Sequence, residues 1–264
     1  MLKQSFCYPL FREADQSLED LCNVAASIGY AAVELWFRDD TFDELCVAAT
    51  GAGLTVASMC GHRSLEGGMA SRGEHDRIEA ELRESIDIAA ARGIPNLICF
   101  SGNGEPGQPR DDAIDACAAC LRRVLPAAER AGVNINIELL NSKIDHVGYL
   151  CDHTAFGAAV CEQAGSERAR MLYDIYHMQI MEGDVIRTLQ QHIARIGHIH
   201  TAGNPGRRDL DDAQELYYPA ICQAIAAAGY TGYVGHEFTP RGDRATALRE
   251  AFACCGGSEK ARRH

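Results

Sequence analysis

Short apolar runs and amphipathic stretches alternate along the chain, about 30 residues apart. Short apolar runs are typical of buried parallel strands, and a 3.6-residue period is typical of helices that bury one face. The runs expected as strands are 5–11, 31–36, 54–59, 96–100, 133–138, 171–174, 196–200 and 232–237. The stretches expected as helices are 17–28, 42–52, 75–92, 111–130, 153–163, 184–192, 218–228 and 244–254. Eight strand–helix units in about 250 residues predict an α/β protein with a (β/α)8 TIM barrel.

An open, doubly wound sheet is the alternative architecture for such an alternating chain. It is disfavoured because Tyr8-Pro9-Leu10-Phe11 stands where a glycine-rich dinucleotide fingerprint would follow the first strand. No Pro/Ser-rich or low-complexity stretch offers a linker, so residues 1–264 are expected to form one domain. The polar tail 256–264 is expected to fray.

Charge and composition exclude several classes of partner. The 37 acidic residues outnumber the 25 basic ones, and no basic stripe is present, which disfavours nucleic-acid binding. The first residues lack a signal-peptide apolar region, and no apolar run approaches the roughly 18 residues of a membrane helix. The twelve cysteines are scattered and are read as reduced thiols. The protein is therefore expected to be soluble and cytoplasmic, with no membrane partner.

Each of the last four predicted strands ends in a side chain that can bind a metal. These side chains are Glu138, Asp174, His200 and Glu237. The carboxyl ends of all strands meet on one face of a parallel barrel, so the four groups are expected to converge. Three carboxylates and one imidazole suit a single divalent ion such as Mn²⁺, Mg²⁺, Co²⁺ or Zn²⁺.

Four further side chains are candidates for binding a substrate. His177 lies three residues after Asp174 and is read as a substrate donor, with a fifth metal ligand or a core histidine as alternatives. His62 follows one predicted strand and Trp36 closes another, and both could line a pocket, although a loop histidine and a core aromatic are equally common. Arg207 lies in a glycine turn, where it could hold an anionic group or be solvated.

Three other polar residues in strands receive simpler readings. His198 alternates with His200 along its strand and is expected to point to the opposite face and pack against a helix. His236 is out of phase with Glu237 and is expected to be structural. Glu34 lies inside a predicted strand, and its role is left open.

Several segments of the sequence resemble those of the hydroxypyruvate isomerase family, within the xylose-isomerase-like TIM barrel superfamily of sugar isomerases and epimerases. The segments that carry the resemblance are 173–184, 197–202, 205–207, 214–219 and 229–238. The resemblance covers most of the chain and implies the metal ligands already named. It also implies that His177 and Arg207 contact substrate.

The resemblance implies a metal-dependent isomerase of the aldose–ketose type. Its substrate would be a small sugar or hydroxy-carbonyl compound, with hydroxypyruvate and tartronate semialdehyde as the natural pair. The expected route is an enediolate, with Glu138 and Glu237 as the acid/base pair that moves the proton. The sequence allows a homo-oligomer.

Other functions stay open at this point. A ketose 3-epimerase or a keto-inositol dehydratase would use similar chemistry, and a metal-dependent sugar-binding protein would use none. The loops 61–74 and 141–152 differ from those of the best-known hydroxypyruvate isomerases, which leaves the substrate open. A related branch contains AP endonucleases with three zinc ions. That reading is disfavoured because the loop 209–215 lacks the Asp-x-His pair that such a site needs.

Overall fold

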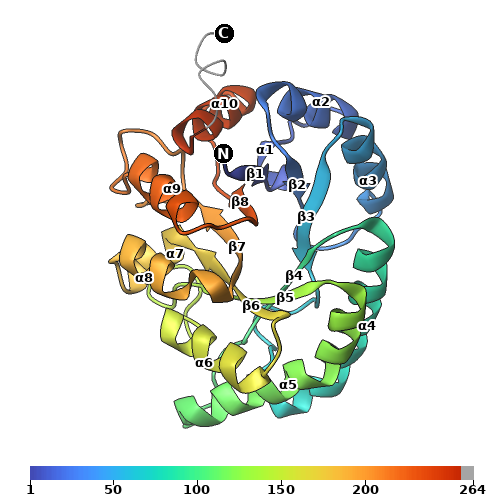
Figure 1. The fold of residues 1–264 in the computed structure, drawn as a ribbon, viewed down its shortest axis with the longest axis vertical. Helices are drawn as coiled ribbons and strands as arrows, with labels where there is room; N and C mark the ends of the chain where they lie inside the picture. Colours follow the sequence, from blue (N-terminus) through green and yellow to red (C-terminus); the bar gives the residue numbers. More distant parts are fainter. Residues whose placement is uncertain (257–264) are drawn as a thin grey trace.

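A computed structural model describes residues 1–256 of the protein, which form a ring of parallel strands inside a ring of helices (Figure 1). The strands are β1 (Lys3–Phe6), β2 (Ala32–Glu34), β3 (Thr55–Cys60), β4 (Asn96–Cys99), β5 (Asn134–Glu138), β6 (Ala169–Asp174), β7 (Ile196–Thr201) and β8 (Tyr233–His236). Neighbours in the chain are neighbours in the sheet, and β1 pairs with β8. The predicted TIM barrel is confirmed.

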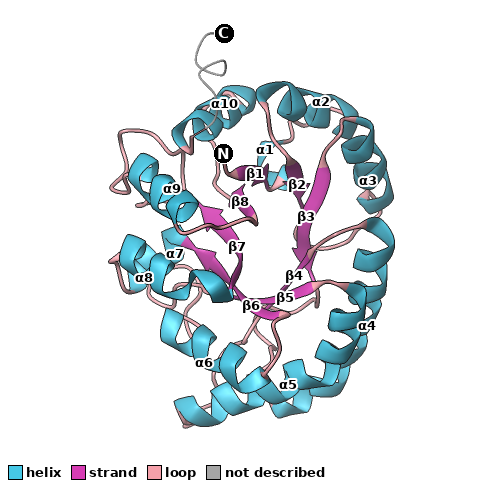
Figure 2. Cartoon of the chain, viewed as in Figure 1, coloured by secondary structure: helices cyan, strands magenta, loops and turns pink. Residues whose placement is uncertain are grey.

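Helices cover the outside of the strand ring (Figure 2). They are α1 (Tyr8–Phe11), α2 (Leu18–Ile28), α3 (Phe42–Gly51), α4 (His75–Arg92), α5 (Arg110–Ala131), α6 (Thr154–Ala164), α7 (Ile175–Met181), α8 (Val185–His192), α9 (Tyr218–Ala227) and α10 (Arg244–Cys254), with 3-10 turns at Arg72–Glu74 and Ile193–Arg195. In the part of the chain that the structure describes, no helix is both long and apolar enough to cross a membrane.

The ring closes between β1 and β2 through few contacts. The Ala31 N–H donates to the Gln4 carbonyl at 2.9 Å, and Cys7 forms a parallel bridge with Glu34. On the other side of β1, Lys3 is in register with Tyr233 of β8. The carboxyl ends of all eight strands therefore face the same end of the barrel.

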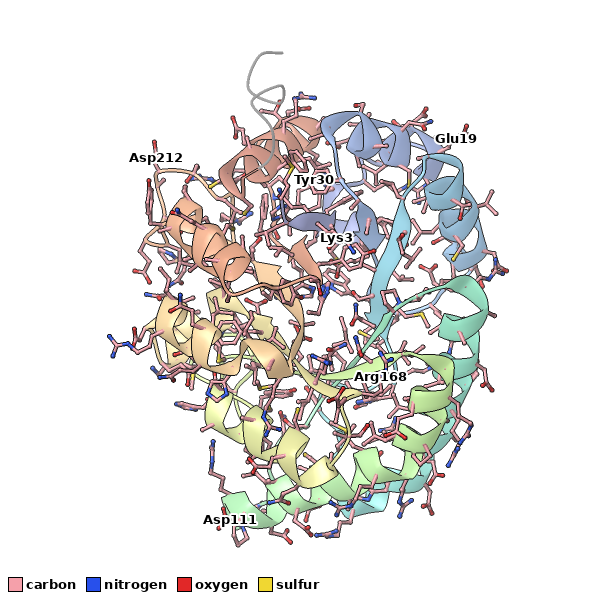
Figure 3. All side chains as sticks on the ribbon, in the orientation of Figure 1. Lys3, Glu19, Tyr30, Asp111, Arg168 and Asp212 are labelled. Atoms are coloured by element: carbon pink, nitrogen blue, oxygen red, sulfur yellow. The ribbon has the colours of Figure 1, made fainter. Side chains whose placement is uncertain are left out.

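Local signals in the sequence set the helix boundaries. The Ser17 hydroxyl accepts a hydrogen bond from the Asp20 N–H at 3.0 Å, which caps α2 as expected from a serine at this position. Gly29 ends the same helix in the left-handed region, with φ 117°, which a side chain would strain. Tyr30 then packs between Phe6 and Phe252 and joins the barrel to α10 (Figure 3).

Two segments differ from the prediction. The first strand ends at Phe6, and Tyr8–Phe11 is a short helix because Pro9 is favoured in the first helical turn and cannot donate within a strand. After β6, a loop was expected where α7 forms. Asp174 caps this helix by accepting a hydrogen bond from the His177 N–H at 3.1 Å. The expected frayed tail, from 257 onward, lies outside the described residues.

Candidate functional site

The four metal-capable side chains at the ends of the last strands lie together. Glu138 ends β5, Asp174 ends β6, His200 lies in β7 and Glu237 follows β8. Asp174 and His200 are register partners, so adjacent strands present them side by side. All four residues are buried, and their ligand atoms lie within 4.8 Å of one another. We call these four residues the central cluster.

Two atoms of the central cluster have no hydrogen-bond partner among the described residues. They are Asp174 Oδ2 and His200 Nδ1, both buried. Leaving buried polar atoms unsatisfied costs about 1–3 kcal/mol each, so folded proteins usually satisfy them. Burial raises the pKa of Asp174 to about 7, although Arg207 opposes this effect. A divalent cation would satisfy both atoms and favour the ionised carboxylate, so the donor set fits such an ion.

A carboxylate below the central cluster orients His200. Glu34 Oε2 lies 3.0 Å from His200 Nε2, so Nε2 carries a proton, and in the neutral ring Nδ1 is free to bind a cation. Nδ1 lies 3.2 Å from Glu237 and 3.6 Å from Glu138. Burial favours neutral His200, but the carboxylates of Glu237 and Glu34 raise its pKa well above the ordinary value. This arrangement is the one by which proteins fix a metal-binding histidine.

The prediction for His198 was wrong, and it hid the role of Glu34. Residues two apart in a strand share a face, so His198 points into the barrel with His200. Its Nε2 lies 2.9 Å from the same Glu34 oxygen. Glu34 also accepts hydrogen bonds from Ser58, at 2.6 Å, and from Ser5. The four donors hold one buried carboxylate in place beneath the central cluster.

His236, by contrast, lies away from the cluster, as expected from its phase along the strand. Its Nε2 lies 2.9 Å from Gln4 Oε1, and its Nδ1 lies 2.7 Å from the Thr201 hydroxyl. Gln4 in turn donates to the Phe252 carbonyl of α10. His236 therefore joins the barrel to the helix layer.

The Glu237 carboxylate accepts hydrogen bonds from side chains of two loops. The Trp36 indole N–H donates to Oε1 and the Arg207 guanidinium donates to Oε2, each at 2.5 Å. Burial would raise its pKa, but Arg207 and His200 hold the pKa of Glu237 well below its ordinary value. Among the described residues, Glu138 has one ion-pair neighbour, the His200 imidazole, whose Nδ1 lies 3.6 Å from Glu138 Oε1. The two glutamates of the central cluster are thus held unequally.

Arg207 reaches the site from an unusual backbone. Its φ of 54° lies in the left-handed region, which is uncommon for a residue with a side chain and recurs at functional sites. Its carbonyl accepts a hydrogen bond from the Thr239 N–H at 3.0 Å, which ties this loop to the segment after β8. The side chain is 30% exposed, so part of the guanidinium faces the open end of the barrel.

His177 presents one free nitrogen. Its Nδ1 accepts from Asn141, whose backbone N–H lies 3.2 Å away and whose side-chain amide lies 2.6 Å away. The proton is therefore on Nε2, which has no hydrogen-bond partner and lies 3.8 Å from Asp174 Oδ2. Burial lowers the pKa of His177 well below its ordinary value. The result is a neutral donor beside the central cluster.

His62 lies at the rim and not in the central cluster. Its Nε2 accepts a hydrogen bond from the Phe100 N–H at 2.9 Å, and burial lowers its pKa to about 4. It lines a groove of about 940 Å³ with residues such as Phe37 and Glu81. Within residues 1–256, no hydrogen bond or ion pair joins His62 to the cluster. Its contact with substrate stays a prediction.

The sequence reading missed Glu34 and Asn141, the two residues that fix the tautomers of His200 and His177. A glutamate among apolar strand residues was the available signal for the first. Asn141, three residues after the end of β5, carried no signal of its own. Trp36 was expected as a pocket wall, whereas its indole N–H contacts Glu237 directly.

Comparisons with known proteins agree with this geometry. The family model described as xylose isomerase-like TIM barrel matches residues 22–255. A 2-oxo-tetronate isomerase of Cupriavidus necator is 38% identical over 237 residues, which are 85% of this chain and 88% of that protein. A human protein provisionally named hydroxypyruvate isomerase is 29% identical over 85% of this chain and 84% of its own length.

A solved structure shares the fold. The crystal structure of an AP endonuclease, family 2, from Brucella melitensis superposes with a TM-score of 0.83 and covers 96% of this chain and 98% of that one. The two sequences are 23% identical. A likeness at this level shows the fold alone and carries no activity across.

Proposed function

The chain belongs to the xylose isomerase-like TIM barrel family, and we propose that it is a metal-dependent isomerase of small hydroxy-keto acids. The observation that carries the proposal is the central cluster, in which three carboxylates and one imidazole converge at the open end of the barrel. Arg207 stands beside it with a guanidinium that can bind a carboxylate. The names of the two relatives support the same reaction class.

The proposed substrates share one chemical core. Hydroxypyruvate and 2-oxo-tetronate both carry a carboxylate at C1, a carbonyl at C2 and a hydroxyl at C3, and they differ in a hydroxymethyl group on C3. Isomerisation moves the carbonyl from C2 to C3 and needs no other reactant. We therefore assign the substrate class by this core, with hydroxypyruvate and tartronate semialdehyde as the three-carbon pair.

Glu138, Asp174, His200 and Glu237 would hold one divalent ion, Mn²⁺, Mg²⁺, Co²⁺ or Zn²⁺. When bound, the ion supplies a Lewis acid that polarises the carbonyl and favours loss of the neighbouring proton. Glu34 keeps His200 Nδ1 turned toward the cluster, and Trp36 keeps Glu237 oriented. These partners hold the site in shape before substrate enters.

Glu138 and Glu237 move the proton in this proposal. A carboxylate oxygen of one glutamate takes the proton from C3, and the C–H electrons form the C2–C3 double bond of an enediolate. The proton of the C3 hydroxyl passes to the C2 oxygen, so C3 becomes the new carbonyl and the old carbonyl oxygen becomes a hydroxyl. The other glutamate, in its protonated form, delivers a proton to C2 and is left ionised. Atoms and electrons balance without an oxidant. His177 donates from Nε2 to a substrate oxygen during these steps.

Turnover of hydroxypyruvate and 2-oxo-tetronate in D₂O tests the proposal. Purified protein should bind about one divalent ion per chain, lose activity with a chelator and regain it with the ion. Deuterium should appear at the product carbon, because the glutamates exchange protons with solvent. Complete retention of the original hydrogen over many turnovers would contradict the enediolate. Two or three tightly held zinc ions per chain would contradict the single site.

The same acid/base pair could instead invert one carbon of a neutral ketose. A panel of ketoses, keto-inositols and hydroxy-keto acids separates the alternatives. An epimerase would turn over ketoses without moving the carbonyl, and a dehydratase would release water. A sugar-binding protein would bind ligand and show no turnover on any of them.

A further inference from the structure

The loop after β5 is a hydrogen-bonded turn built around one asparagine. Asn141 Oδ1 accepts hydrogen bonds from the Ile144 N–H at 3.0 Å and the Asp145 N–H at 2.9 Å. The Asn141 carbonyl accepts from the His146 N–H at 3.1 Å. The backbone that carries His146 is therefore fixed by three bonds to a single residue.

This turn is also attached to α7. Asp145 Oδ2 accepts hydrogen bonds from the Tyr176 hydroxyl at 2.9 Å and from the Asn141 side-chain amide at 2.7 Å. The His177 ring lies between two others, with its centroid 5.1 Å from that of Tyr176 and 5.3 Å from that of His146. Because hydrogen bonds join the loop to α7, the position of His146 beside His177 is fixed.

His146 brings a second free nitrogen to this place. Its Nε2 is buried and has no hydrogen-bond partner within residues 1–256, as is true of His177 Nε2. The His146 ring centroid lies 5.3 Å from that of His177, whose Nε2 lies 3.8 Å from Asp174 Oδ2 of the central cluster. Among the described residues, His146 is not a member of either group able to hold a metal. Its unpartnered nitrogen is therefore left for a group other than the ion.

We propose that His146 is a further substrate-binding residue, which with His177 and Arg207 holds the carboxylate of the hydroxy-keto acid. This inference rests on the proposed function. The His177 Nε2–H and the guanidinium are donors, the His146 imidazole can donate from Nε2, and an ionised carboxylate is purely an acceptor. A neutral hydroxymethyl group at the same place would have to donate its hydroxyl proton, and none of these three side chains would accept it. The subsite therefore selects acids over ketoses of equal size.

Kinetics of His146→Phe and His146→Gln test this role. Phenylalanine keeps a ring over His177 but removes the donor, so KM for hydroxypyruvate should rise about 10-fold with little change in kcat. Glutamine restores a donor and should recover part of the loss. KM for a neutral ketose such as erythrulose should stay unchanged in both variants. His153→Phe, on an imidazole of the same loop that bonds Asp152 at 2.7 Å, is the matched control.

A binding measurement on the unaltered protein tests the inference without any variant and without catalysis. D-glycerate carries the carboxylate but no carbonyl, and glycerol is its neutral counterpart. With Mg²⁺ present, glycerate should shift the imidazole NMR signals of His146 and His177, and glycerol should not. Glycerate binding with these shifts but no isomerisation of any acid would sink the proposed function and leave this inference standing.

Other outcomes overturn the inference itself. The first is that the unaltered protein isomerises hydroxy-keto acids and the His146→Phe variant has the same KM for them. Another is an equal loss on acids and neutral ketoses, because His146 would then only support the loop. Glycerate binding that does not shift the His146 NMR signals would also contradict the inference.

Discussion

Strands β5 to β8 each deliver one member of the central cluster, whereas β1 to β4 deliver none. The first half of the barrel instead supplies partners for the second. Glu34 at the end of β2 orients His200, and Trp36 in the following loop binds Glu237. The difference shows how a symmetric fold supports an asymmetric site. One half holds the proposed ligands, and the other half fixes their tautomers and rotamers.

Asp174→Asn should have the largest effect, because it removes a charge from the half that is proposed to hold the ion. Divalent ion binding should weaken by more than the roughly 10–100-fold that loss of an outer partner costs, and turnover should disappear. Calorimetry with Mn²⁺ measures the affinity. Asp184→Asn, at the start of α8, is a control on an exposed acid. Unchanged affinity would break the assignment of β6 to the ion-binding half.

Glu138→Gln and Glu237→Gln should each lower kcat by about 10²–10⁴-fold, since each removes one partner of the proton transfer. Some metal binding should remain, because an amide oxygen can still coordinate. Single-turnover rates at saturating metal separate the two effects. Substantial activity in either variant would place the acid/base pair elsewhere.

Glu34→Gln tests the supporting half directly. Glutamine has one acceptor oxygen and an NH2 group that only donates, so it cannot keep all four hydrogen bonds that Glu34 accepts. The negative charge that holds a proton on His200 Nε2 is also lost. Affinity for the divalent ion should fall about 10–100-fold, while the folded barrel is retained. Ser58→Ala, which removes one donor to Glu34 and leaves the carboxylate, should have less effect. If Glu34→Gln and the unaltered protein bound the divalent ion equally well, the proposed division between a ligand half and a supporting half would be wrong.

Arg207→Lys should raise KM for hydroxy-keto acids about 10-fold and leave neutral ketoses little affected. Lysine keeps the charge but not the forked geometry that can bind Glu237 and a carboxylate together. Initial rates on matched acid and ketose substrates measure the split. Equal losses on both would mean that Arg207 serves only to hold Glu237.

Trp36→Phe should have the smallest effect. It removes the indole N–H from Glu237 but keeps an aromatic ring, and Arg207 still binds the same carboxylate. A net hydrogen bond of about 1 kcal/mol corresponds to roughly a five-fold fall in kcat. A loss as large as that in Glu237→Gln would make Trp36 an equal partner in the site and weaken the comparison.

The alternation of strands and helices could be predicted because each element buries a face whose period is visible in the sequence. The convergence of Glu138, Asp174, His200 and Glu237 could also be predicted. Each follows an apolar run, and the barrel brings all strand ends to one face. Their roles as ligands stay predictions. The short helices α1 and α7 were missed because their starts depend on Pro9 and on the Asp174 cap, which are single local contacts.

The supporting residues could not be predicted in the same way. Glu34 finds its partners on other strands, with Ser58 on the adjacent β3, 24 residues away, and His198 on β7, 164 residues away. No local spacing encodes such contacts. His146 is similar, since its place over His177 depends on a loop whose hydrogen bonds centre on Asn141. The reading of His198 failed for a simpler reason, because residues two apart in a strand share a face.

The pairing of β1 with β8 determines when the barrel can close during translation. Gln4 must meet Phe252, a residue 248 positions later. At roughly 5–20 residues per second, β1 waits for its partner strand on the order of ten to fifty seconds, with an unpaired edge that could capture other chains. Glu237 emerges with β8. A nascent chain therefore cannot assemble the complete central cluster until β8 and Glu237 have emerged from the ribosome.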